Sequence, residues 1–175
     1  MLDTTVRPLI NPILAALARV AIGLGASANA VTALGALVGV AAAVAIATQH
    51  FYLALALVAI NRILDGVDGA VARHHGVSDW GGYFDIVSDY VFYAAVPLGF
   101  AFANPAANAL PAAALLASFC LTCSSFLAYA ILAEKRGLQT SAHGRKSFFY
   151  STGLVEGTET VVALLLMTAL PDWFP

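Results

Sequence analysis

The chain has 175 residues, of which 61% are hydrophobic and 10% are charged, and its formal net charge is −2. A soluble domain carries about a quarter charged residues, so this composition excludes a chain whose surface is mainly exposed to water. The length suits a single domain over residues 1–175, and the composition predicts an all-α integral membrane protein.

The first segment, about residues 2–24, has apolar residues at helical spacing. Ile10, Leu14 and Leu17 lie on one stripe, while Arg7 and Arg19 lie off it. This pattern predicts an amphipathic helix lying in the membrane interface rather than crossing it. A poorly ordered tail is the alternative. We therefore divide the chain into an interfacial helix at 1–26 and a transmembrane bundle at 27–175.

About five apolar segments follow, and we interpret each as a membrane span, which takes roughly 20 residues. They cover residues 30–48, 51–64, 82–103 and 110–133, and a fifth ends near residue 170. Ser27 is the expected N-cap of the first span. A turn at 49–50, a loop at 74–80 and a turn containing Asn104, Pro105 and Asn108 separate the spans.

The basic residues indicate the orientation of this bundle. With this count of spans, all eight fall on one side of the membrane: Arg7, Arg19, Arg62, Arg73, Lys135, Arg136, Arg145 and Lys146. Basic residues mark the cytoplasmic side. We therefore expect the N-terminus and the loops after the second and fourth spans in the cytoplasm, in a bacterial inner membrane.

Four aspartates lie where a membrane helix rarely carries them: Asp65, Asp68, Asp85 and Asp89. Each Asp at a helix centre costs about 2.5 to 3.5 kcal/mol on insertion scales. Spacings of three and four place each pair on one helix face, and the short connecting loop makes the two helices antiparallel neighbours. Both pairs should then converge near the cytoplasmic boundary.

Four converging carboxylates repel one another unless some are protonated or a cation lies between them. Hard divalent cations prefer carboxylate oxygens, and Mg²⁺ commonly completes its shell with substrate phosphates. The acids therefore predict a metal site. The alternative is a set of helix-end acids with no shared role.

Small and basic residues accompany these acids. Gly69 and Ala72 lie on the helix face of the first pair and leave space beside it, and Arg73 could pair with an anionic group bidentately. Gly81 precedes Asp85 by one turn and again opens space.

Written out, the segment is Asp65-Gly66-Val67-Asp68-Gly69-Ala70-Val71-Ala72-Arg73, then seven residues, Gly81, three residues, Asp85, three residues and Asp89. It resembles DxxDGxxAR…GxxxDxxxD, the signature of the CDP-alcohol phosphotransferase family. The gap before Gly81 is one residue shorter than the commoner spacing. The Asn29-x-x-Thr32 start of the first span is also similar. The family usually has six spans, so the resemblance implies that a last helix is missing from this sequence.

The resemblance implies a role for each of these residues. Asp65, Asp68 and Asp85, with Asp89, would hold Mg²⁺ or Mn²⁺, as two ions. Asp89 would also be the general base. The donor-binding residues would be Asn29, Thr32, Asp65, Gly69, Ala72, Arg73 and Gly81. An alcohol hydroxyl would then displace CMP from a CDP-linked lipid, with CDP-diacylglycerol as the expected donor, in phospholipid synthesis. The resemblance also implies a homodimer.

The acceptor side has weaker signals. Arg145 and Lys146 form a basic patch that either holds an acceptor phosphate or a lipid headgroup, or simply anchors the loop in the cytoplasm. Glu156 and Glu159 lie three apart on one predicted helix face, either as partners of the helix dipole or as the lining of the acceptor pocket. These acids suit a neutral or cationic acceptor.

Two other functions compete with this prediction. A membrane cation transporter or channel also uses intramembrane carboxylates, although it should show broken helices or inverted repeats. A non-catalytic scaffold need not keep all four aspartates. The expected partners are the bilayer, the CDP-linked donor and the alcohol acceptor, and no nucleic acid.

Overall fold

The computed structural model describes residues 3–137 and 157–175, and all regular secondary structure within these ranges is helical. The elements are α1 (Asp3–Gly23), α2 (Ala28–Ala47), α3 (Phe51–His75), α4 (Asp79–Ala103), α5 (Pro105–Lys135), α6 (Gly157–Ala169) and the short 3-10 helix η1 (Pro171–Trp173). The prediction of an all-α membrane fold is confirmed.

Serine side chains cap two of these helices, α2 and α4, and fix where they begin. Ser27 Oγ accepts a hydrogen bond from the Ala30 amide at 3.2 Å, as the sequence predicted for α2. Ser78 Oγ accepts one from the Gly81 amide at 3.1 Å and begins α4. Such caps satisfy amide groups that the first turn of a helix leaves without partners.

The turn expected at Asn104, Pro105 and Asn108 is shorter in the structure than predicted. Asn104 alone separates α4 from α5, and its Oδ1 accepts a hydrogen bond from the Ala107 amide at 3.3 Å. Pro105 occupies the first turn of α5, where a missing N–H costs nothing. Asn108 is buried within α5 and donates to the Phe100 carbonyl at 2.9 Å.

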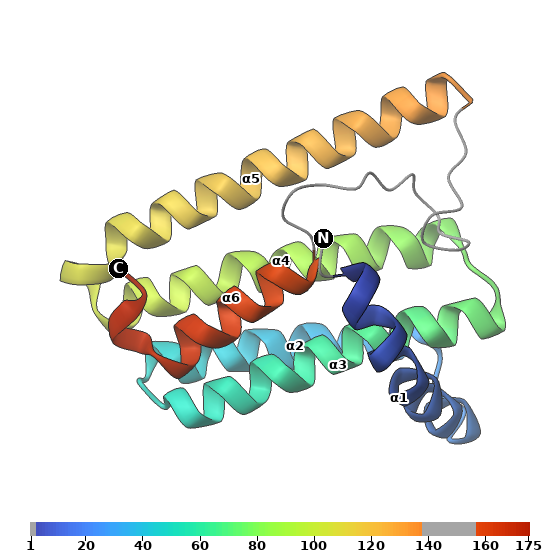
Figure 1. Ribbon diagram of the computed structural model, residues 1–175, viewed down its shortest axis with the longest axis horizontal. Coiled ribbons are helices and arrows are strands. Elements are labelled where there is room, and N and C mark those ends of the chain that lie inside the picture. Colours follow the sequence, from blue (N-terminus) through green and yellow to red (C-terminus); the bar gives the residue numbers. More distant parts are fainter. Residues whose placement is uncertain (1–2, 138–156) are drawn as a thin grey trace.

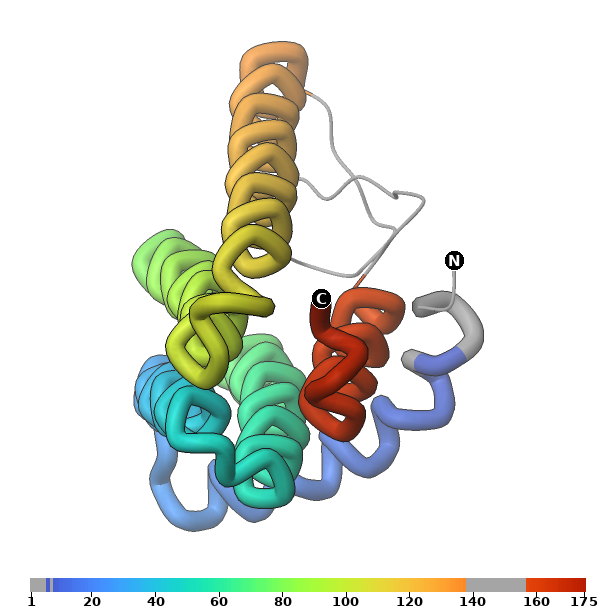
Figure 2. The backbone as a smooth tube through the Cα atoms, turned by 90° about the vertical axis from the view of Figure 1, so that its left-hand side faces the viewer, coloured from blue at the N-terminus to red at the C-terminus, as the bar shows by residue number. Residues whose placement is uncertain are grey.

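Helices α2, α3 and α4 form the compact part of the molecule (Figures 1 and 2). Helix α2 packs extensively against both α3 and α4, α5 packs against α4, and α6 packs against α3. Helix α1 lies crosswise to the other helices instead of along them, and it packs mainly against α3 (Figures 1 and 2). The C-terminus of α3, the N-terminus of α4 and the C-terminus of α5 lie at the same end of the molecule as α1 (Figure 1).

The predicted amphipathic helix is present as α1, but its apolar stripe is divided. Ala18 is buried and Leu14 is partly buried against the bundle, whereas Ile13 and Leu17 are exposed. A Cβ on Gly66 would lie 2.6 Å from Leu14 Cδ1, so this glycine lets α1 sit directly on α3. The exposed apolar side chains suit contact with lipid, and the interfacial position stays a prediction.

Within residues 3–137 and 157–175, three helices are long and apolar enough to cross a membrane: α2, α4 and α5. Helix α3 has the same length as α4, 25 residues, but Arg62, Asp65 and Asp68 lie near its middle, whereas the acids of α4 lie in its first half. Helix α6 has 13 residues, fewer than a span requires, and the residues before it lie outside the described part of the chain. The fifth span therefore stays a prediction.

Candidate metal and substrate site

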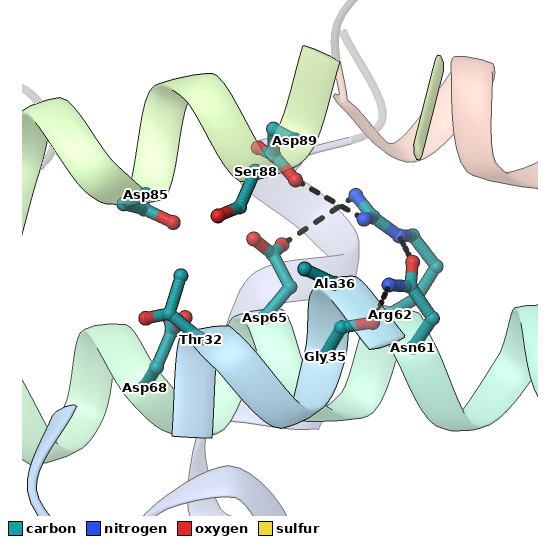
Figure 3. A pocket seen from close by; sticks show the side chains of 10 residues that line it. All are labelled: Thr32, Gly35, Ala36, Asn61, Arg62, Asp65, Asp68, Asp85, Ser88 and Asp89. Carbon is teal, nitrogen blue, oxygen red and sulfur yellow. Dashed lines mark hydrogen bonds and ion pairs between the residues drawn. The ribbon is translucent and has the colours of Figure 1, made fainter. Parts of the chain in front are cut away.

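Three of the four aspartates meet between α3 and α4 (Figure 3). One carboxylate oxygen each from Asp65, Asp68 and Asp85 lies within 4.8 Å of the other two. Divalent ions bind carboxylate oxygens at about 2.0 to 2.6 Å, so a single ion between these oxygens could reach all three. These three acids therefore converge as their helical spacing predicted, and the donor set fits a hard divalent cation.

Asp68 is the most enclosed of the three acids, with 4% of its surface exposed. Thr32, which is also buried, donates a hydrogen bond from Oγ1 to Asp68 Oδ2 at 2.6 Å. Thr32 belongs to α2 and so connects a third helix to the acid cluster. The resemblance predicted that Thr32 lines a donor pocket, and in the structure it lines the cleft while its hydroxyl orients Asp68.

The other predicted donor-binding residues lie toward the loop between α3 and α4. Asn29 lies beside the start of α4, because a Cβ on Gly81 would be 3.3 Å from Asn29 Oδ1. Arg73 is exposed and folds back along its helix, since a Cβ on Gly69 would be 3.4 Å from Arg73 Nη1. Ala72 is half-buried. Gly69 therefore leaves room for the Arg73 guanidinium along α3.

Asp89 accepts a hydrogen bond from an arginine that also pairs with Asp65. Arg62 Nη2 donates a hydrogen bond to Asp89 Oδ1 at 3.1 Å, and Arg62 Nη1 lies 3.7 Å from Asp65 Oδ2. Arg62 was predicted only as one of the eight basic residues that mark the cytoplasmic side, and its contact with the acids was not predicted. Arg62 lies within α3 with only 9% of its side chain exposed, because the neighbouring acids and aromatic rings of α4 enclose it.

A signal for this residue was present in the sequence. Arg62 lies three positions before Asp65, which places both on one helix face, and it is a lone charge in the apolar run 51–64. Asn61 and Ser88 were also not predicted, although both are buried and line the cleft. Their types and spacing carried no recognisable pattern.

Comparison with known proteins decides the family. The model of the CDP-alcohol phosphatidyltransferase family matches residues 26–173. The chain belongs to this family. The Inner membrane protein YnjF of Escherichia coli (strain K12) is 42% identical over 174 residues, which cover 99% of this chain and 84% of that protein.

A solved structure has the same fold. It is the crystal structure of Mycobacterium tuberculosis phosphatidylinositol phosphate synthase (PgsA1) with CDP-DAG bound, which matches with a TM-score of 0.67 at 24% identity. The match covers 93% of this chain and 78% of that one. At this level of identity the likeness concerns the fold.

The members of this family are membrane-bound transferases. Membership also supports a divalent-metal site at the acids. The structure says less about the residues predicted to bind the acceptor. Arg145, Lys146 and Glu156 lie outside the described residues, and Glu159 lies in the first turn of α6, which packs against α3. The acceptor pocket of this family member stays a prediction.

Proposed function

We propose that the protein transfers a phosphatidyl or other substituted phosphoryl group from a CDP-linked donor to an alcohol hydroxyl, with release of CMP. The expected donor is CDP-diacylglycerol. The observation that carries this proposal is the meeting of Asp65, Asp68 and Asp85 in one cluster, with Asp89 one turn further along α4. These are the acidic positions of the family signature, and they meet inside a membrane bundle.

This arrangement suits phosphoryl transfer, which depends on positioning the reactants and neutralising phosphate charge. A divalent ion held by the three clustered carboxylates would supply most of that neutralisation. Arg73 adds an exposed guanidinium in the last turn of α3, which suits a phosphate oxygen. Membership of the family supports a CDP-linked donor, and the solved structure with a similar fold has CDP-DAG bound.

We assign the proton transfer to Asp89. Its Oδ1 accepts the hydrogen bond from Arg62, and its Oδ2 is the atom that would take the proton from the acceptor hydroxyl. The hydroxyl oxygen would bond to the phosphorus that carries the lipid. The bond from that phosphorus to the bridging oxygen would break, and this oxygen would leave with CMP.

The test is CMP release from CDP-diacylglycerol by the purified protein in detergent, with a panel of alcohols and with Mg²⁺ or Mn²⁺. We expect Asp89→Asn to lower kcat by about 100-fold or more, the usual contribution of a general base, while CDP-diacylglycerol still binds. Asp79→Asn is the matched control, because Asp79 begins the same helix and is exposed outside the cleft. It should turn over normally.

Two results would contradict the proposal at different points. Normal turnover by Asp89→Asn would remove the general-base assignment and leave the transferase activity. Absence of binding to any CDP-linked donor, together with cation flux in vesicles, would favour the transporter alternative.

A further inference from the structure

Arg62 places a fixed positive charge inside the acid cluster. Its guanidinium donates to Asp89 Oδ1 at 3.1 Å and lies 3.7 Å from Asp65 Oδ2, so it bridges an acid of α3 and an acid of α4. A cation between two carboxylates is what a second metal ion would also provide. In this chain the side chain of Arg62 already occupies that position.

The position of Arg62 is built by several buried groups. Its Nε donates to Asn61 Oδ1 at 2.7 Å, and Asn61 Nδ2 donates in turn to the Gly35 carbonyl of α2 at 2.8 Å. The guanidinium carbon lies 4.2 Å from the centre of the buried Phe92 ring. The hydrogen bond to Asn61 and the face of the Phe92 ring therefore hold the guanidinium in one orientation.

Helix α2 can support this arrangement because of a glycine. A Cβ on Gly39 would lie 3.0 Å from both Asn61 Nδ2 and Phe92 Cδ2. Any larger residue would press on the two groups that hold Arg62. Residues of α2, α3 and α4 therefore hold Arg62 in place together. An isolated ion pair on the protein surface has no such set of buried contacts.

The acids divide into two groups around Asp65 (Figure 3). Asp68 and Asp85 lie on one side of it, and Arg62 reaches it from the other side, together with Asp89. The free space in the cleft is about 10 Å³, close to the volume that one water-sized probe needs. One ion among Asp65, Asp68 and Asp85 fits this space, whereas a second ion would meet the guanidinium.

We propose that Arg62 is a positioning residue that takes the place of a second divalent ion. The chain then holds one ion, at Asp65, Asp68 and Asp85, and Asp89 stays outside the metal shell with Arg62 as its partner. This inference rests on the proposed function and replaces the two ions that the family resemblance implied. It also leaves one oxygen of Asp89 for a proton, where a metal-bound carboxylate would be a weaker base.

The number of ions per chain tests this directly. Mn²⁺ is titrated into the full chain in detergent, and free Mn²⁺ is followed by electron paramagnetic resonance. We expect one Mn²⁺ per chain for the wild type and for Arg62→Lys, which keeps the charge. Arg62→Gln should bind two Mn²⁺ ions per chain, because removal of the guanidinium leaves the carboxylates of Asp65 and Asp89 without a neighbouring positive charge. Arg73→Gln, the matched control in the last turn of α3, should bind one.

Two ions in the wild type, or one ion in Arg62→Gln, would overturn the assignment to Arg62. If Arg62→Gln does not fold, Asp89→Asn provides the second measurement. It should still bind one Mn²⁺ per chain, and loss of an ion from a wild-type count of two would overturn the proposal. The CMP assay separates the two proposals: CMP release with two ions bound refutes only the role of Arg62, and one ion bound without CMP release refutes only the transferase.

Discussion

At the scale of single residues, the hydroxyl of Thr32 determines how Asp68 faces the metal site. It donates to Asp68 Oδ2 at 2.6 Å, and both residues are buried. Groups that orient a metal ligand are typically worth 10- to 100-fold in metal affinity. We therefore expect Thr32→Val, which keeps the shape and removes the donor, to raise the Mn²⁺ dissociation constant by about 10-fold or more.

Thr32→Ser is the matched control for this prediction, because it keeps the hydroxyl and removes only the methyl group. Its Mn²⁺ dissociation constant should stay within about threefold of the wild-type value, below the 10- to 100-fold change that loss of an orienting group causes. Titration of both variants by electron paramagnetic resonance gives the comparison. Equal affinities of Thr32→Val and the wild type would show that Asp68 needs no such support.

The convergence of the acids could be predicted from the sequence, but the surroundings of Arg62 could not. Asp65, Asp68 and Asp85 were predictable because helical spacing and a short loop force their convergence. The environment of Arg62 was not, because its burial depends on which face α4 turns toward α3. The distribution of basic residues along the chain predicts the side of the membrane on which each one lies. It does not predict which side chains each one contacts.

At the scale of the helices, close contact between α2 and α4 depends on Gly99. A Cβ there would lie 2.6 Å from the Ala43 carbonyl oxygen, and a backbone atom cannot turn aside as a side chain would. Gly99→Ala should therefore force the helices apart and destabilise the protein by about 1 to 3 kcal/mol, the usual cost of overpacking. The measurement is the midpoint of thermal unfolding in detergent, read as loss of the monodisperse peak in size-exclusion chromatography.

Gly35→Ala is the control for this contact, since Gly35 is a helical glycine of α2 whose added Cβ would meet only Leu64 Cβ, at 3.6 Å. Alanine is a better helix former than glycine by up to about 1 kcal/mol, so this variant should unfold at or above the wild-type midpoint. A Gly99→Ala midpoint equal to that of Gly35→Ala would mean that α2 and α4 are less tightly packed than this contact implies.

Helices were predictable to different extents. Apolar runs and the Ser27 cap located α2 well. The start of α5 was misplaced because Pro105 and Asn104 were both taken as turn residues, whereas a proline fits the first turn of a helix. Which helices touch was the least accessible feature, because it depends on close approaches such as those at Gly66 and Gly99.

At the scale of the whole molecule, the two ends of the bundle differ in charge. Arg73, Lys135 and Arg136 lie at the end that carries α1 and the loop between α3 and α4. The opposite turn contains Gln49 and His50, and Gln49 Nε2 donates to the Ala103 carbonyl at 2.8 Å. The positive-inside rule then predicts that the end with the acid cluster faces the cytoplasm, where a CDP-linked substrate would be supplied.

Single cysteines at the two ends test this orientation. In a background with Cys120 and Cys123 replaced by serine, His50→Cys and Arg136→Cys each place one thiol at an exposed position. In spheroplasts, a membrane-impermeant maleimide should label position 50 and spare position 136, because charged reagents do not cross the bilayer. Both should react once detergent opens the membrane, which controls for reactivity. Labelling of position 136 alone in intact spheroplasts would show that the orientation is the reverse of the predicted one, with the acid cluster on the outer face.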